Sequence, residues 1–188
     1  MVKELTIVQT LIPFLSRPKE ALHLAFLSKE IHEPHPTVRL WLQVLEEEGI
    51  LKKSFKGRLT LFSLNYDHPL LLEYLVVAEK WKIIKKAKEE LLFKELLSFL
   101  DTSLTENNNA LLFGSAVLSF KTASDIDILI TGSIDQKKVE MFSKKVNKQI
   151  HLIVVKSLSH VSAALKVEII KKHLIIKGSE DIARWLLW

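Results

Sequence analysis

The first third of the chain repeats apolar residues at helical spacing. The pattern predicts one helix over residues 5–14 and a second over residues 21–31, because apolar side chains three or four positions apart share one face of a helix. A turn with two prolines follows at residues 33–36, and proline does not fit the interior of a helix. A third helix is expected to begin at Pro36 or Thr37.

The third helix is followed by a predicted hairpin. Apolar side chains from Val38 to Leu45 form one stripe of this helix and leave a polar face on its other side. Gly49 ends the helix, and residues 50–64 predict two short strands around the basic turn 56–58. Three helices and then a basic hairpin is the order of a winged helix. Residues 36–53 also resemble winged-helix regulators that are common in archaea.

A winged helix places its third helix in the major groove of duplex DNA and its hairpin tip against the backbone. Arg39 and Gln43, one turn apart, are the candidates for contacts with base edges. The hairpin has four cations and no acid, which suits phosphate contacts. The alternative is a winged helix used for protein contacts, since Glu46, Glu47 and Glu48 disfavour DNA. We take these acids to lie away from the DNA-facing start of the helix. The predicted DNA-binding residues are Thr37, Arg39, Gln43, Lys52, Lys53, Lys56 and Arg58.

The middle of the chain, residues 67–106, predicts a helical connector of one or two helices. Its apolar stripe runs from Leu70 to Leu100. Such a stripe is usually core, and the alternative is packing against a second copy in a homodimer. Three asparagines at 107–109 then predict a loop.

Two carboxylates follow a buried strand in the last third. Residues 110–113 predict that strand, and Gly114-Ser115 can bring backbone N–H groups and a hydroxyl close to phosphates. Asp125 and Asp127 begin a second strand, where residues two apart point to the same side. Carboxylates this close repel each other unless a cation lies between them, and Mg²⁺ is the expected cation.

The segment Phe113-Gly114-Ser115, followed after nine residues by Asp125-Ile126-Asp127, resembles the signature of the DNA polymerase β-like nucleotidyltransferase superfamily. The likeness covers residues 90–188 and is greatest to the minimal nucleotidyltransferases. It implies that Gly114, Ser115 and Ser124 lie beside the triphosphate of an NTP such as ATP and that both aspartates hold Mg²⁺. It also implies transfer of a nucleoside monophosphate to a hydroxyl group, and a HEPN-type toxin as a partner.

Two departures weaken a catalytic interpretation. Leu118-Ser119 stands where many minimal members have Arg-Gly, and His151, on a predicted strand over 149–155, stands where the third acid is expected. Imidazole can bind a metal but lacks the negative charge of a carboxylate. The catalytic candidates are therefore Asp125, Asp127 and His151, and two hypotheses stay open. The protein either transfers a nucleotide, or it is a regulator or antitoxin whose site only binds nucleotide or a partner.

The rest of the chain predicts a helix over 135–148, a second helix over 157–173, a break at 177–180 and a short final helix. The fold class is thus α+β, with a winged-helix domain over 1–66, a helical connector over 67–106 and a small mixed-sheet nucleotidyltransferase-like domain over 107–188.

Composition narrows the picture further. The 188 residues suffice for two small domains. The net charge of +5 is uneven, with nine Lys/Arg against seven Asp/Glu in 1–66, six against eight in 67–106 and twelve against seven in 107–188. The absence of cysteine excludes disulfides and thiolate metal sites. Residues 1–4 do not look like a signal peptide, and no apolar run reaches the roughly 18 residues of a membrane span. We therefore expect a cytoplasmic protein that does not cross a membrane.

Overall fold

The structure is a computed structural model that describes residues 6–188. The chain forms two compact units, one up to Trp81 that also includes Leu187, and a second of residues 82–186 with Trp188. The boundary lies inside helix α5 (Leu71–Glu89). The composition of helices and two small sheets confirms the α+β class. Two expectations concern residues outside the described range. They are the helix start at Leu5 and the interpretation that residues 1–4 do not look like a signal peptide.

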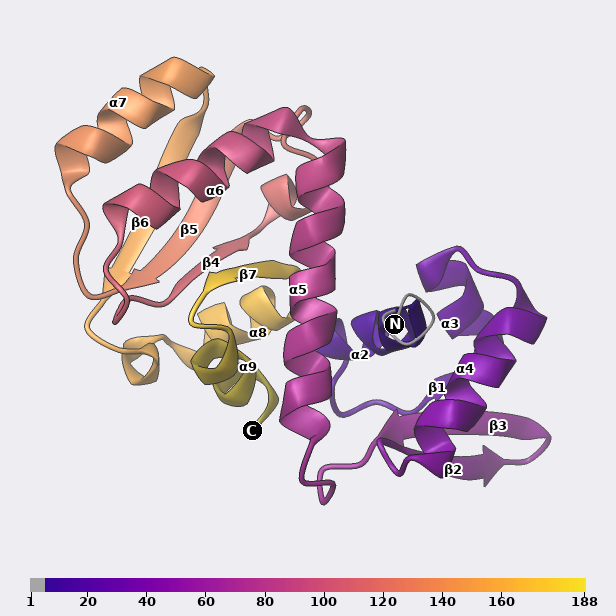
Figure 1. The fold of residues 1–188 in the computed structure, drawn as a ribbon. Helices are drawn as coiled ribbons and strands as arrows, with labels where there is room; N and C mark the ends of the chain where they lie inside the picture. The colour runs from indigo at the N-terminus through magenta and orange to yellow at the C-terminus, as the bar shows by residue number, and fades with distance from the viewer. Residues whose placement is uncertain (1–5) are drawn as a thin grey trace. The chain divides into compact units, whose positions relative to one another are not determined.

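The first unit contains short helices and a three-stranded antiparallel sheet (Figure 1). The sheet has the strand order β1-β3-β2. Buried apolar side chains from every helix fill its core, for example Phe14, Leu27 and Leu42. Its elements are η1 (Gln9–Leu11), α2 (Ile12–Ser16), β1 (Leu22–His23), α3 (Leu24–Ile31), α4 (His35–Glu47), β2 (Leu51–Lys56), β3 (Leu59–Leu64) and the first part of α5.

The helix predicted over 21–31 begins later than expected. Leu22 and His23 form a short strand that pairs with Phe62 and Leu61 of β3. The imidazole Nδ1 of His23 then accepts a hydrogen bond from the backbone N–H of Phe26 at 3.3 Å, which caps α3. The prediction was wrong here because the strand partner lies some forty residues away in the sequence, where helical periodicity cannot detect it.

The predicted hairpin forms as expected. β2 and β3 pair in an unbroken antiparallel register from Leu51↔Leu64 to Lys56↔Leu59, and Gly57 turns the chain with φ +60°. The tight turn explains the glycine, since a left-handed φ is strained for residues with a Cβ.

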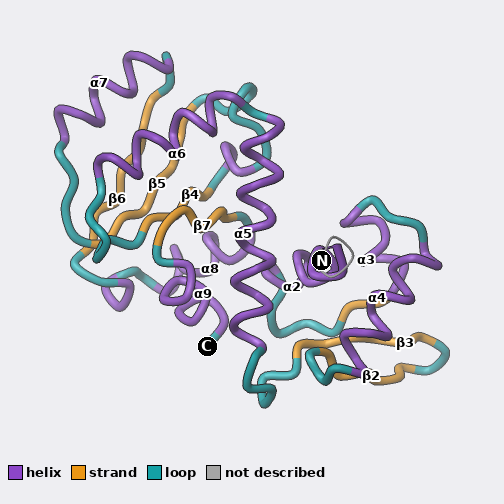
Figure 2. The backbone as a smooth tube through the Cα atoms, viewed as in Figure 1, coloured by secondary structure: helices purple, strands orange, loops and turns teal. Residues whose placement is uncertain are grey.

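The second unit has a four-stranded mixed sheet of order β6-β5-β4-β7, labelled in Figure 2. β4 pairs antiparallel with β5 and β7, and β5 pairs parallel with β6. Besides the second part of α5, the elements are α6 (Leu91–Ser103), β4 (Ala110–Phe113), η2 (Ser115–Val117), β5 (Asp125–Thr131), α7 (Gln136–Val146), β6 (Gln149–Val155), η3 (Leu158–His160), α8 (Ala163–Lys171), β7 (His173–Lys177) and α9 (Ser179–Leu187).

Helices α6 and α7 cover one face of this sheet (Figure 1). Ile126, Ile128 and Ile130 of β5 join buried side chains of both helices in one core cluster. Because side chains alternate along a strand, Asp125 and Asp127 belong to the opposite face. The apolar stripe of α6, including Phe93 and Leu96, is buried in the same cluster, so this part of the stripe is core.

The predicted helix over 157–173 is only partly present. The segment contains η3 and α8, and it is followed by strand β7, which was not predicted. β7 starts at His173 and pairs with β4 from Phe113↔His173 onward. A short apolar run such as Leu174-Ile175-Ile176 fits a buried strand and a helix equally well by periodicity alone. Within residues 6–188 no helix is both long and apolar enough to span a bilayer.

Candidate functional site

The parallel pairing of β5 with β6 brings the three predicted catalytic residues together. Asp127 lies opposite His151 in the register, and Asp125 lies opposite Gln149. The Nδ1 atom of His151 is 3.3 Å from Oδ1 of Asp127 and 3.5 Å from Oδ2 of Asp125. One possible ligand atom from each of the three residues lies within 4.8 Å of the others. Two strands therefore form a three-residue cluster that could hold a metal ion.

The cluster is open to solvent. The side chains of Asp125, Asp127 and His151 are 31%, 25% and 46% exposed. This openness leaves room for water or a phosphate oxygen beside a bound ion. Ser124, just before β5, donates a hydrogen bond from Oγ to Oδ1 of Asp125 at 3.2 Å.

Gly114 lies directly against the cluster. Its φ of +74° and ψ of −151° belong to a region that is essentially restricted to glycine. A Cβ at this position would overlap Oδ2 of Asp127. The missing side chain therefore lets the backbone pass the carboxylate and places exposed Ser115, the first residue of η2, directly after this turn.

The donor set of the cluster is two carboxylates and one imidazole. Carboxylate oxygens suit Mg²⁺, whereas imidazole nitrogen suits Zn²⁺ and other transition metals. The carboxylates therefore fit the expected Mg²⁺, and His151 does not add the third oxygen ligand that a three-acid site offers.

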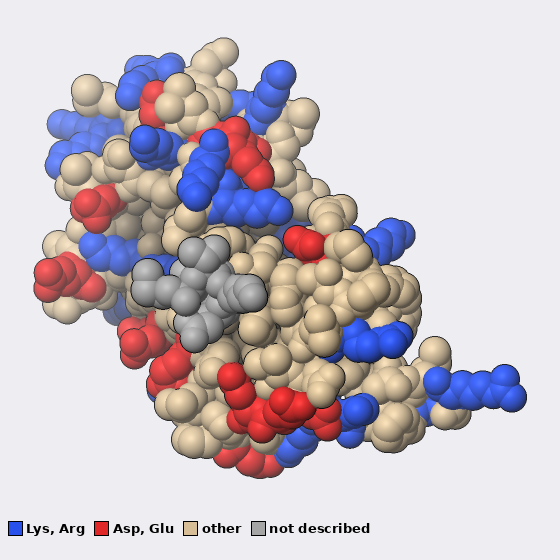
Figure 3. Space-filling view, turned by 45° about the vertical axis from the view of Figure 1, so that its right-hand side comes forward, with Lys and Arg blue, Asp and Glu red and all other residues tan. Residues whose placement is uncertain are grey.

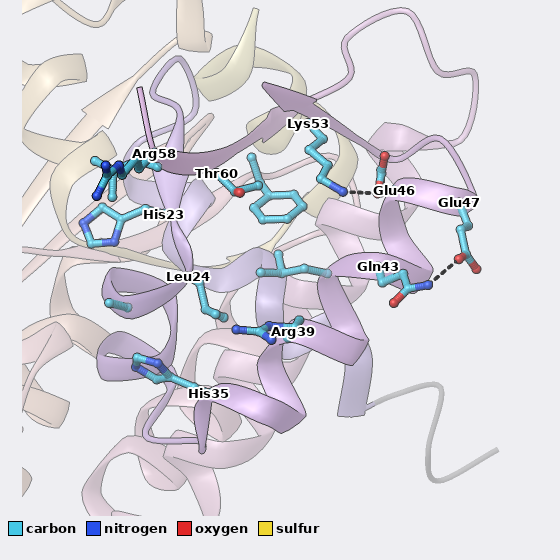
Figure 4. A pocket seen from close by; sticks show the side chains of 14 residues that line it. His23, Leu24, His35, Arg39, Gln43, Glu46, Glu47, Lys53, Arg58 and Thr60 are labelled. Carbon is cyan, nitrogen blue, oxygen red and sulfur yellow. Dashed lines mark hydrogen bonds and ion pairs between the residues drawn. The ribbon is translucent and has the colours of Figure 1, made fainter. Parts of the chain in front are cut away.

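A groove of about 770 Å³ lies in the first unit between α4 and the hairpin (Figure 4). Four of the seven predicted DNA-binding residues line it, two from α4 and two from the hairpin. They are Arg39, Gln43, Lys53 and Arg58.

The other three predicted DNA-binding residues do not line the groove. Thr37 is half-buried in the first turn of α4. Lys52 and Lys56 share one face of β2, while Lys53 is on the other face. Lys52 forms a 2.6 Å ion pair with Asp67. The hydrogen bond from Lys52 and the charge of its ammonium group lower the pKa of the Asp67 carboxyl.

Two acids also line the groove, although sequence analysis placed them away from the DNA-facing side. Glu46 lies 3.6 Å from Nζ of Lys53, and Glu47 accepts a 2.8 Å hydrogen bond from Nε2 of Gln43 (Figure 4). α4 runs along the groove, so that its C-terminal turn lies beside β2. Lys53 and Gln43, two of the predicted DNA contacts, therefore already have intramolecular partners in Glu46 and Glu47. Which side of α4 faces DNA stays a prediction.

The groove contains two histidines that were not among the predicted contacts. His23, at the end of β1, and His35, the first residue of α4, both line it (Figure 4). His23 had no sequence signal, because its segment was predicted as helix. On the face in Figure 3, basic and acidic side chains are interspersed. Phosphate binding on that face would therefore depend on local clusters of basic side chains.

No protein-family model and no curated protein matches this chain. A solved structure of a mutant toxin–antitoxin pair, MntA–HpeT, is similar over 50% of this chain and 79% of that chain, with 13% sequence identity and a TM-score of 0.38. That likeness is too low to assign a fold or a function.

Proposed function

We propose that the protein is a DNA-binding regulator whose second unit binds a nucleoside triphosphate together with a divalent cation. One observation carries the proposal: Asp125, Asp127 and His151 meet beside Gly114, whose backbone passes close to Asp127 only because it lacks a Cβ. Like charges at this spacing need a cation, donors or full solvation.

The nucleotide would lie across this open cluster. Backbone N–H groups and the hydroxyl of Ser115 would bind its phosphates, with Ser124 beside Asp125. The carboxylates would hold the cation, which would neutralise phosphate charge. The motif resemblance supports the same assignment of Gly114, Ser115 and the two aspartates.

Calorimetric titration with ATP or CTP tests this proposal. We expect binding in the presence of Mg²⁺ or Mn²⁺ and a loss of at least about 100-fold in the double variant Asp125→Asn with Asp127→Asn, since charged pairs to a cation are removed. The matched control is Asp101→Asn, an exposed carboxylate on α6. Binding that survives the double variant, or no binding by the native protein, contradicts the proposal.

The first unit would bind duplex DNA as a winged helix. The order of three helices and a hairpin, and the cations along one groove, support this assignment. We expect binding in low salt that weakens as salt rises, because bound phosphates release counterions. Arg39→Ala should relax sequence preference, since Arg39 is the candidate for base contacts. A native protein that binds no duplex at low salt would contradict this part of the proposal.

Nucleotidyl transfer is the second candidate function, favoured by the exposed position of the cluster. The acceptor hydroxyl oxygen would attack the α-phosphorus, the bond to the β-phosphate oxygen would break, pyrophosphate would leave and the hydroxyl proton would pass to water. Incubation with α-³²P-labelled NTPs tests it through label on DNA, on the protein or on a partner. If the missing third acid prevents transfer, His151→Asp should increase labelling.

Three further expectations stay proposals. The family resemblance suggests a HEPN-type toxin as partner, and the composition suggests a cytoplasmic protein. A homodimer along residues 70–100 would have to use the exposed apolar side chains of that segment, such as Val77, Ile84 and Leu91, because Phe93 and Leu96 are buried within the second unit. The division of the chain into a winged-helix domain over 1–66, a connector over 67–106 and a nucleotidyltransferase-like domain over 107–188 likewise stays a prediction.

A further inference from the structure

We infer that the cluster of Asp125, Asp127 and His151 binds Zn²⁺ most tightly, Mn²⁺ next and Mg²⁺ weakly. This selectivity deepens the proposed function, because it rests on the same aspartates as cation ligands. It departs from the Mg²⁺ expected from the sequence.

The ligand types give the first argument. The imidazole of His151 faces both carboxylates through Nδ1, and nitrogen ligands favour later transition metals over Mg²⁺. Mg²⁺ dehydrates reluctantly and is usually held by carboxylates and phosphates. Two carboxylates also give the site less negative charge than three, which weakens its attraction for a hard cation.

The spacing gives the second argument. Nδ1 of His151 lies 3.3 and 3.5 Å from the two carboxylate oxygens, and one possible ligand atom from each residue lies within 4.8 Å of the others. One ion could therefore be bound by both carboxylates and the imidazole together. It would replace the hydrogen bond between Nδ1 and Oδ1 of Asp127.

The position on the sheet gives the third argument. His151 and Asp127 are register partners on adjacent strands, so the backbone ladder fixes their separation. The side chains are partly exposed, which leaves the fourth position to water or a phosphate oxygen, as in zinc sites that keep one position open.

The first experiment titrates the metal-stripped full chain with ZnCl₂, MnCl₂ or MgCl₂ by calorimetry, without nucleotide. We expect Zn²⁺ to bind at least about tenfold more tightly than Mn²⁺, and Mn²⁺ more tightly than Mg²⁺. The variant His151→Asn should lose at least about tenfold in Zn²⁺ affinity. His151→Asp should lower Zn²⁺ affinity and raise Mg²⁺ affinity.

Other histidines require a control, because Zn²⁺ binds exposed imidazoles in general. The matched control is His160→Asn, which changes an exposed histidine in the same unit whose Nδ1 lies 2.9 Å from Oγ of Ser157. Its Zn²⁺ affinity should equal that of the native chain. Nitrogen-15 NMR of the histidine rings gives an independent readout, in which Zn²⁺ should shift Nδ1 of His151 and leave Nε2 protonated.

Equal affinity for Mg²⁺ and Zn²⁺, or Zn²⁺ binding that is unchanged in His151→Asn, overturns the inference. Other outcomes test the proposed function separately from the metal selectivity. If the metals bind in the expected order but no nucleotide binds, the regulator proposal falls and the selectivity stands. If nucleotide binds equally well with Mg²⁺ and with Zn²⁺, the selectivity falls and the proposal stands.

Discussion

The two candidate sites are built from different kinds of structural support. The cluster in the second unit consists of short side chains on adjacent strands, with a glycine backbone against one carboxylate. The groove in the first unit is lined by long side chains from a helix and a hairpin, and two of these are paired with Glu46 and Glu47.

This difference determines how each site should respond to change. A site on paired strands has little freedom to adjust, so a single added atom should disrupt it. A groove of long surface side chains can rearrange, because exposed ion pairs contribute little and exchange readily with other partners. We therefore expect large, local effects in the cluster and graded effects in the groove.

The largest effect is expected from Gly114→Ala. The new Cβ would overlap Oδ2 of Asp127, at a backbone conformation that is essentially restricted to glycine. We expect a loss of at least about 2 kcal/mol in unfolding free energy together with loss of cation binding. Urea unfolding and calorimetry measure the two effects.

Gly57→Ala is the matched control. Gly57 also has a positive φ, but a Cβ there would meet nothing within 4 Å. Its cost should be about 1 kcal/mol from the left-handed backbone alone, with cation binding unchanged. Equal losses in the two variants would show that the overlap with Asp127 is unimportant.

A smaller effect is expected from Arg58→Ala in the groove. If Arg58 contacts one phosphate, duplex affinity should fall and the slope of log K against log salt should decrease by about 0.9. Lys29→Ala serves as the control, because Lys29 is an exposed lysine of α3 that does not line the groove. DNA titrations at several salt concentrations compare them, and equal effects would contradict a role for the groove.

The proximity of the two carboxylates could be predicted from the sequence because it follows from a local rule. Two carboxylates two residues apart must share one face of a strand, and the structure brings Asp125 and Asp127 to the same cluster. The predicted strands over 110–113 and 149–155 agree with the bounds of β4 and β6, and β5 begins at Asp125 as predicted. His151 was placed by the expected position of a third ligand, and the parallel register puts it beside Asp127.

The groove was less predictable because its composition depends on tertiary pairing. Whether Lys52 or Lys53 faces α4 depends on the register of a hairpin against a helix, and a one-residue change reverses it. β1 and β7 also depend on tertiary pairing, because both are short strands whose partners lie far away in the sequence. Local periodicity contains no information about such partners.

A still smaller effect is expected from Glu46→Gln, which frees Lys53 from its 3.6 Å ion pair. Lys53 could then approach a phosphate, and duplex affinity should rise about two- to fivefold, in line with the small energy of exposed ion pairs. The same change in a Lys53→Ala background should have no effect if the two residues are coupled. Glu20→Gln controls for the loss of one negative charge, and an equal gain there would refute the coupling.

The smallest expected effect concerns the exposed ion pair of Lys52, on β2, and Asp67. The hydrogen bond and charge of Lys52 lower the pKa of Asp67 in the folded state. A lowered carboxyl pKa contributes stability that is present above the pKa of the unfolded chain and is lost as pH falls through the folded pKa. Lys52→Met should therefore reduce stability slightly at neutral pH, and the difference from the native protein should disappear in acid.

Carbon-13 NMR titration of the Asp67 carboxyl measures the cause directly. The pKa of Asp67 should rise in Lys52→Met. It should stay lowered in Lys56→Met, which removes a cation from the same strand but leaves the pair of Lys52 and Asp67 intact. An unchanged pKa in Lys52→Met would mean that the ion pair does not persist in solution, and Lys52 would then be available to DNA in the same way as Lys53 of the groove.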